Sequence, residues 1–303
     1  MLTVLQTALE VGLIYGLVAL ALFISFSILN IADLSTDGCF TLGAAVGATV
    51  AISGHPYLAI PAAMGAGVLS GFVTAFLQTK MGIDSLLAGI IVNTGLYSVN
   101  IAVMGNSSLL NMNRTETVFT KVKAALDGTP FAGSTKLIVS AAAVIVVAVL
   151  LGLFLRTRLG LAIRATGNNP DMVRSSSINT ALTTIVGLCV ANAVTALSGC
   201  LVAQSQKSVN IDIGTGMVTI ALASLLIGNA FFRKRGLGLR IFGMVLGAFL
   251  FRLVYTVALR FNMPAFMLKL VSSVIVVIAI SAPYFKKQIP VFIKRLRGAA
   301  KEK

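Results

Sequence analysis

Long apolar runs, each about 20 residues, follow one another along most of this chain, and a helix of about that length crosses the hydrocarbon core of a bilayer. Only 11% of the 303 residues are charged. Soluble domains carry about 25% charged residues, so these charges cannot cover a soluble surface. The runs predict an all-α polytopic membrane protein, with residues 1–303 in one transmembrane domain. Nine spans are expected, at about 8–29, 40–52, 58–77, 85–104, 137–155, 181–203, 217–232, 241–259 and 265–284.

The distribution of Lys and Arg predicts how these spans are oriented, because cytosolic loops are rich in both residues. If the basic tail 285–303 is cytosolic, alternation through nine spans puts sixteen of the 24 Lys and Arg residues on the cytosolic side. The N-terminus is then outside, and the loop 105–134 is extracellular. Within this loop, TETVFTKVKAAL predicts a short amphipathic helix. The net charge of +15 is thus dispersed between spans, and nucleic acid is not an expected partner.

The longest polar interruption that carries several arginines covers residues 159–179, LGLAIRATGNNPDMVRSSSIN. Four arginines lie within it or just before it: Arg156, Arg158, Arg164 and Arg174. Gly, Asn and Pro mark a helix followed by a turn. Since the charge distribution places this stretch in the cytosol, it predicts a docking surface for a cytosolic partner.

Two shorter polar breaks resemble each other. Residues 30–38 read NIADLSTDG and residues 210–216 read NIDIGTG, and each precedes a short apolar segment rich in Ala and Gly. The breaks fall on opposite sides of the membrane in the alternation, which is what an inverted repeat leaves. The matched letters are few, so an inverted repeat and a chance likeness both stay open. In transporters, short or broken helices of this kind lie near the binding site.

Polar side chains in and near these breaks are the candidate pathway. The carboxylates there either line a cavity or cap the helices that follow, since Asp and Ser are good N-caps. Asn93, Tyr97 and Asn100 fall at helical spacing within one span, which predicts either a polar lining or hydrogen bonds between helices. The candidate pathway residues are Asp33, Ser35, Asp37, Asn93, Tyr97, Asn100, Asp212 and Thr215.

No catalytic constellation is found in the sequence. The only histidine is His55, and the three cysteines have no metal-ligand spacing, so neither an enzyme nor a metal site is expected. The pattern G-x-x-x-x-G-K-[ST] does not occur, so the chain has no P-loop for ATP. A transporter of this kind draws its energy from another subunit or from an ion gradient. Acidic residues deep inside the spans are scarce, which weakens the proton-coupled option.

The 159–179 region resembles the permease subunits of ATP-binding-cassette importers of the branched-chain amino acid and ribose permease family. The matching residues are Thr157-Arg158-Leu159-Gly160, Ala165-x-Gly167-Asn168-Asn169 and Ser177-Ile178-Asn179. Two further signatures are similar: Ile31-Ala32-Asp33-Leu34-Ser35, and Ile227-Gly228 with the basic turn at Gly236. The resemblance covers nearly the whole chain. NIADLSTDG and GIIVNTGLYSVN look most like a branch associated with uptake of amino acids, aromatic ones among them.

Two departures from the family pattern lie in the same region. Pro170 and Asp171 stand where many relatives have Glu or Ala, and Ser175–Ser177 replace the common Leu-Ser-Gly. Both leave open where the coupling helix begins and ends.

The resemblance implies a subunit of an importer in the bacterial plasma membrane. Two permease copies form the pathway, an ATPase dimer that binds ATP and Mg docks on residues 159–179, and an extracellular or lipid-anchored solute-binding protein delivers the substrate. This chain itself is expected to hold no cofactor. A sugar or nucleoside permease and a gradient-driven secondary transporter are the alternatives. The implied ATPase-coupling residues are Gly160, Ala165, Gly167, Asn168, Asn169, Pro170, Met172 and Ser177.

Overall fold

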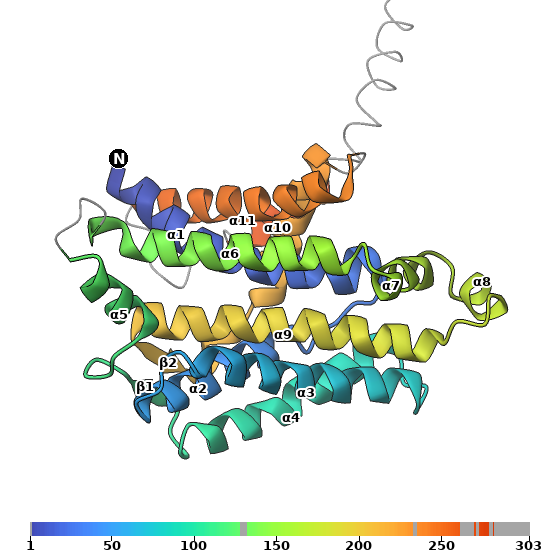
Figure 1. Ribbon diagram of the computed structural model, residues 1–303, viewed down its shortest axis with the longest axis horizontal. Coiled ribbons are helices and arrows are strands. Elements are labelled where there is room, and N and C mark those ends of the chain that lie inside the picture. Colours follow the sequence, from blue (N-terminus) through green and yellow to red (C-terminus); the bar gives the residue numbers. More distant parts are fainter. Residues whose placement is uncertain are drawn as a thin grey trace, which may run out of the picture.

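The computed structural model describes residues 2–127, 132–232, 235–260, 270, 273–278 and 281. Nearly all of the secondary structure in these residues is helical, as the apolar runs predict (Figure 1). The α-helices are α1 Leu2–Leu22, α2 Thr36–Ile52, α3 Ala59–Thr79, α4 Ser85–Val103, α5 Val118–Ala125, α6 Thr135–Phe154, α7 Arg158–Asn168, α8 Pro170–Ser175, α9 Thr180–Gln206, α10 Met217–Phe232 and α11 Leu237–Arg260. The π-helix η1 Phe23–Ile28 extends α1, and η2 Ala132–Ser134 and η3 Ile211–Gly214 are short 3-10 helices.

Seven helices of the described chain are long and apolar enough to cross a membrane, two fewer than the nine spans expected for the whole chain. The second expected span, 40–52, is α2, which begins earlier, at Thr36, but with 17 residues is still shorter than each of the seven. Most of the ninth expected span, 265–284, lies outside the described residues, as does the tail 285–303. The seven are Gln6–Ile28, Ala59–Thr79, Ser85–Val103, Thr135–Phe154, Thr180–Gln206, Ile211–Phe232 and Leu237–Ala258.

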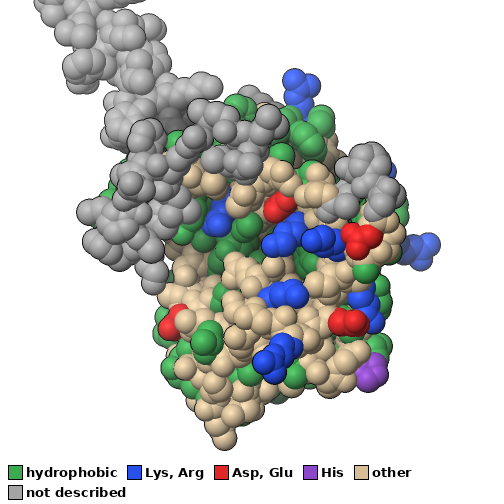
Figure 2. Space-filling model, turned by 90° about the vertical axis from the view of Figure 1, so that its left-hand side faces the viewer, with side chains coloured by type: hydrophobic (Ala, Val, Ile, Leu, Met, Phe, Trp, Pro, Cys, Tyr) green, Lys and Arg blue, Asp and Glu red, His purple; other side chains and the backbone are tan. Residues whose placement is uncertain are grey.

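The two ends of the helical bundle differ (Figure 1). At one, called the hairpin end here, strands β1 Leu109–Asn111 and β2 Ser208–Asn210 pair antiparallel, with Leu109 opposite Asn210. The amphipathic helix expected in the loop 105–134 is confirmed as α5, which lies at this end and buries Val118 and Phe119. The other, called the α8 end, carries α7 and α8. Figure 2 shows the hairpin end, where basic and acidic side chains are interspersed.

Helix α9 lies at the centre of the bundle and packs on α1, α2 and α3. Its residues from Ala191 to Gln204 are all buried. Glycines make the contact with α2 close: a Cβ at Gly43 would fall on the carbonyl oxygen of Ala196, and a Cβ at Gly199 would fall on that of Phe40. Small residues therefore bring the two backbones together, which is how membrane helices gain packing contacts.

The short helices α2 and α10 begin beside each other and run to opposite ends of the molecule. Their first turns touch, because Asp37 of α2 bonds to Gly216 and Val218 at the start of α10. The chain after α2 reaches the hairpin end, where Gln204 of α9 donates to the Pro56 carbonyl at 3.4 Å. The chain after α10 reaches the α8 end. Two short helices with opposite directions are the arrangement that an inverted repeat produces.

Candidate transport site

Asp33 and Ser35 form a buried, hydrogen-bonded polar cluster just before α2. Asp33 has 2% of its surface exposed. Its Oδ1 accepts hydrogen bonds from the Ser35 backbone N–H at 2.9 Å and from the Ser35 hydroxyl at 2.6 Å. Its Oδ2 accepts from Nδ2 of Asn192 in α9 at 2.9 Å, and the Thr74 hydroxyl of α3 donates to that of Ser35 at 3.3 Å. This cluster joins the residues just before α2 to α3 and α9.

Asp37 accepts hydrogen bonds from backbone N–H groups at the start of a different helix, α10. Its Oδ2 accepts from the Gly216 N–H at 2.9 Å and its Oδ1 accepts from the Val218 N–H at 2.8 Å, and α10 begins at Met217. The first amides of a helix have no partner within it and carry partial positive charge. A carboxylate from α2 therefore caps α10, and the two short helices are joined at their N-termini.

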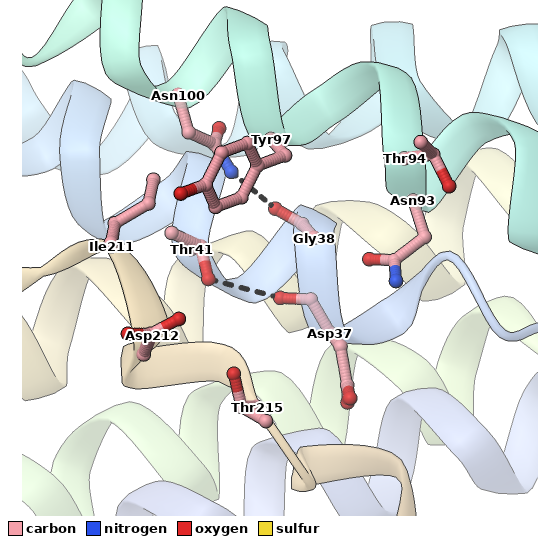
Figure 3. A pocket seen from close by; sticks show the side chains of 10 residues that line it. All are labelled: Asp37, Gly38, Thr41, Asn93, Thr94, Tyr97, Asn100, Ile211, Asp212 and Thr215. Carbon is pink, nitrogen blue, oxygen red and sulfur yellow. Dashed lines mark hydrogen bonds between the residues drawn. The ribbon is translucent and has the colours of Figure 1, made fainter. Parts of the chain in front are cut away.

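A cavity of about 320 Å³ lies against this junction, between α2, α4 and η3 (Figure 3). Ligand pockets in proteins have volumes of about 300–1,000 Å³, so its size suits a small solute. Eight of its ten lining residues have polar side chains. The lining residues are Asp37, Gly38, Thr41, Asn93, Thr94, Tyr97, Asn100, Ile211, Asp212 and Thr215.

Helix α4 supplies one wall of the cavity. Asn100 is 1% exposed, and its Nδ2 donates to the Gly38 carbonyl at 3.1 Å. The helices approach closely at this point, since a Cβ at Gly38 would lie 2.6 Å from Oδ1 of Asn93. Tyr97 is 52% exposed, so the polar side of α4 continues from the cavity to the surface of the bundle.

The structure brings together six of the eight residues predicted for the pathway: Asp37, Asn93, Tyr97, Asn100, Asp212 and Thr215. The helical spacing of the three α4 residues correctly predicted a shared face. Asp33 and Ser35 do not line the cavity. Capping describes Asp37, but the helix that it caps is α10 and not α2. Asp33 accepts from the N–H of Ser35, which precedes α2, and the side chain that caps η3 is Asn210, whose Oδ1 accepts from the Asp212 N–H at 3.1 Å. The transport role of all eight stays a prediction.

At the α8 end, local sequence signals fold residues 157–179 into two short helices. The Thr157 hydroxyl caps α7 by accepting from the Gly160 N–H at 3.2 Å. Asn169 ends α7 and caps α8, its Oδ1 accepting from the Met172 N–H at 3.1 Å, and Pro170 takes the first helical position. Pro is favoured there because its missing N–H would have no partner. The unusual Pro170 therefore starts α8 and does not break a helix.

The coupling residues divide into two groups. Gly160 and Gly167 are packing residues: a Cβ at Gly160 would meet the carbonyl of Phe154, and one at Gly167 would fall on the carbonyl oxygen of Ile28. Ala165 is half-buried. The others are exposed, and they are Asn168, Asn169, Pro170, Met172 and Ser177.

Comparison with known proteins agrees with this architecture. The family model described as branched-chain amino acid transport system, permease component, matches residues 4–280. The chain belongs to the family of branched-chain amino acid transport permeases. A tyrosine transport system permease protein of Clostridioides difficile (strain R20291) is 31% identical over 267 residues, 88% of this chain and 86% of that protein. An uncharacterized protein of Rickettsia prowazekii (strain Madrid E) is 32% identical over 285 residues, 92% and 97% of the two chains. No solved structure matches.

Several residues of the permease site were missed at the sequence level. Gly38, Thr41 and Ile211 line the cavity, and Asn192 bonds to Asp33. Thr41 lies one helical turn from Asp37, so extending the polar face by one turn would have found it. Asn192 is 159 positions from Asp33, and only the fold brings the two together.

Proposed function

We propose that this permease is the membrane subunit of an ATP-driven importer of an amino acid, aromatic ones included. The observation that carries the proposal is the polar cavity at the junction of α2 and α10, in a bundle of membrane helices. Short helices that start inside a bundle direct free N–H groups and polar side chains at a solute. The tyrosine permease that is similar over most of the chain supports the amino acid and the aromatic class.

The energy source in this proposal is an ATPase subunit that docks at the α8 end. Helices α7 and α8 are capped, and they are fixed to the bundle by Gly167 against Ile28. Met172 projects from α8 with 64% of its surface exposed, as an apolar anchor of a docking surface does. ATP binding by the partner would then stabilise one of two conformations of the permease.

The α8 end is cytosolic in this proposal, and the hairpin end receives a solute-binding protein outside the cell. Basic residues support this direction. Among the described residues, those at the α8 end are Lys80, Arg156, Arg158, Arg164, Arg174, Arg235 and Arg240, and those at the hairpin end are Arg114, Lys121, Lys123, Lys136, Lys207 and Arg260, the last residue of α11. Within the same described part, the acidic residues at the α8 end are Asp84 and Asp171, and those at the hairpin end are Glu10, Glu116 and Asp127.

A second permease copy completes the pathway in this proposal. The cavity opens beside Thr94 and Tyr97, both exposed on α4. Exposing such groups to lipid is unfavourable, because polar atoms in hydrocarbon lose their hydrogen bonds. Packing of α4 against α4 of a second copy would enclose these residues in a polar passage.

The decisive experiment is uptake by proteoliposomes that contain the permease together with the ATPase subunit and the solute-binding protein that this proposal assigns to it. We expect uptake of radiolabelled tyrosine that requires ATP and all three components. Uptake by the permease alone under an ion gradient would establish a secondary transporter instead. Uptake of ribose or a nucleoside in place of an amino acid would overturn the substrate class.

Docking at α8 is tested by Met172→Glu in the same proteoliposomes. We expect ATP-driven uptake to fall by at least about 10-fold, since burying an unpaired charge in an interface costs several kcal/mol. The matched control is Met81→Glu, because Met81 is equally exposed at the same end, in the turn between α3 and α4. Equal uptake by the Met172 variant and the wild type would contradict the docking surface.

A further inference from the structure

The charged residues that line the cavity are all acidic. Of its ten lining residues, none is Lys, Arg or His, and two are aspartates, Asp37 and Asp212. Cavities lined by one sign of charge concentrate ligands of the opposite sign. The cavity therefore favours a group that is positively charged and rich in hydrogen-bond donors.

The two aspartates differ in how far they are already satisfied. Both oxygens of Asp37 accept backbone N–H bonds from the start of α10. The carboxylate of Asp212 accepts no hydrogen bond and makes no ion pair with any residue that the structure describes, and only its backbone N–H is bonded, to Asn210. Asp212 is thus the carboxylate in the cavity that remains available to a ligand.

A second, independent observation comes from Asn100 on the opposite wall. Its side chain is 99% buried, and its Nδ2 donates to Gly38, which leaves Oδ1 as a buried acceptor without a partner among the described residues. A buried acceptor of this kind costs free energy unless a donor reaches it. Figure 3 shows Asn100 and Tyr97 above Asp212, with Asn93 and Thr94 on the far side of Asp37.

We propose that the cavity binds the α-ammonium group of the transported amino acid, with the Asp212 carboxylate and Asn100 Oδ1 as its acceptors. The inference rests on the proposed function. An ammonium group has three N–H donors and no acceptor, which matches a free carboxylate and an unpartnered amide oxygen. Asn93, Thr94 and Tyr97 can donate hydrogen bonds from the other side, and they are left for the rest of the solute.

The site lies where an incoming solute first meets the bundle. The Ile211 N–H, next to Asp212, donates to the Ser108 carbonyl beside β1 at 3.0 Å, so Asp212 is held directly beneath the hairpin end. The Asp37 junction lies on the α8 side of it. Asp212 would therefore take the ammonium group before the junction of α2 and α10 has to open.

The first test is direct binding to the purified full-length permease, followed by thermal shift. The probes are L-tyrosine, tyramine, which keeps the ammonium and lacks the carboxylate, and 3-(4-hydroxyphenyl)propionate, which lacks the ammonium. We expect tyrosine and tyramine to raise the unfolding temperature at millimolar concentrations and the propionate to have no effect. Binding of the propionate with the same affinity as tyramine would overturn the proposal.

Variants then locate the ammonium group. Asp212→Asn keeps the size of the side chain, and we expect it to weaken tyramine binding about 10-fold or more, since hydrogen bonds to charged groups are worth about 1.5–3 kcal/mol. Asp212→Glu restores the charge and should recover part of the binding. Asp127→Asn is the matched control: it removes one carboxylate at the same end, outside the cavity, and should bind as the wild type does. Unchanged tyramine binding by Asp212→Asn would overturn the proposal.

Uptake separates this inference from the proposed function. In proteoliposomes with ATPase and binding protein, Asp212→Asn should lower the maximal rate about 10-fold, with the half-saturating concentration of loaded binding protein unchanged. ATP-driven uptake that is normal in Asp212→Asn would overturn the ammonium site and leave the importer intact. No ATP-driven uptake by the wild type, with tyramine binding still dependent on Asp212, would overturn the importer and leave the site intact.

Discussion

Asp37 joins two helices that lie far apart in the sequence, and its contacts depend on both oxygens being acceptors. In Asp37→Asn one oxygen becomes an NH₂ donor that faces the N–H of Gly216 or Val218, so one amide loses its partner. We expect the free energy of unfolding to fall by about 1–3 kcal/mol, and uptake to fall with it.

Thermal unfolding of this variant can be followed through the protein's own cysteines. Cys39 and Cys200 are buried and unpaired, so a thiol-reactive fluorophore gains signal as the protein unfolds on heating. Asp127→Asn should unfold at the wild-type temperature, because exposed substitutions change stability by about 0.5 kcal/mol or less. Wild-type unfolding of Asp37→Asn would show that the cap on α10 contributes nothing to stability.

Ser177 adopts a left-handed backbone conformation, with φ of +61°. This conformation costs an L-residue about 1–2 kcal/mol. Ser177→Gly should therefore tighten the turn between α8 and α9 and slow tryptic cleavage after Arg174 about 5-fold, the equivalent of about 1 kcal/mol in local opening. Ser176→Gly, at a position with φ of −87°, should not slow cleavage. Equal cleavage of both variants would contradict the strain.

For single residues, the sequence predicted which side chains of one helix share a face. It did not predict contacts between residues that are far apart in the sequence. Asn93, Tyr97 and Asn100 follow the period of a single helix, so their common face could be read directly. Asp37 and the start of α10 are 179 positions apart, and no local pattern records that contact. The capping preference of Asp was recognised, but the helix that Asp37 caps could not be.

Helices α2 and α9 depend on glycine for their contact. A Cβ at Gly43 would fall on the Ala196 carbonyl, so even Gly43→Ala must push the two helices apart. We expect a loss of about 1–3 kcal/mol from overpacking, seen as earlier unfolding in the thiol assay. Gly65→Ala in α3 is the control, since nothing lies within 4 Å of its added Cβ. A stable Gly43→Ala variant would mean that α2 can move away from α9 at no cost.

Among the elements, the long apolar helices, α5 and the short helices after the two polar breaks were predictable, and the two strands were not. Helix α2 has 17 residues, and Asp33 and Ser35 just before it have partners inside the bundle, so the polar break does not need to reach water. Strands β1 and β2 have three residues each, too few to show a period of two. Their pairing, like that of Asp37, is a long-range contact.

For the whole molecule, the prediction is the direction in which it crosses the membrane. Ser175→Cys on α8 and Lys123→Cys on α5 place single exposed thiols at opposite ends. A membrane-impermeant maleimide added to intact cells should label the α5 variant and spare the α8 variant, and inverted vesicles should give the reverse. Labelling of the α8 variant in intact cells would reverse the proposed orientation.

The link between Asp37 and Gly216 also sets an order of events during synthesis. When α2 enters the bilayer, the amides that will satisfy Asp37 have not been made, because they lie 179 residues downstream. At about 5–20 residues per second, the ribosome needs roughly 10–35 seconds to supply them. During that interval the Asp37 carboxylate lies on a helix too short to span and has no N–H partners from α10. The N-terminal part of the bundle therefore becomes stable only when α10 has been synthesised.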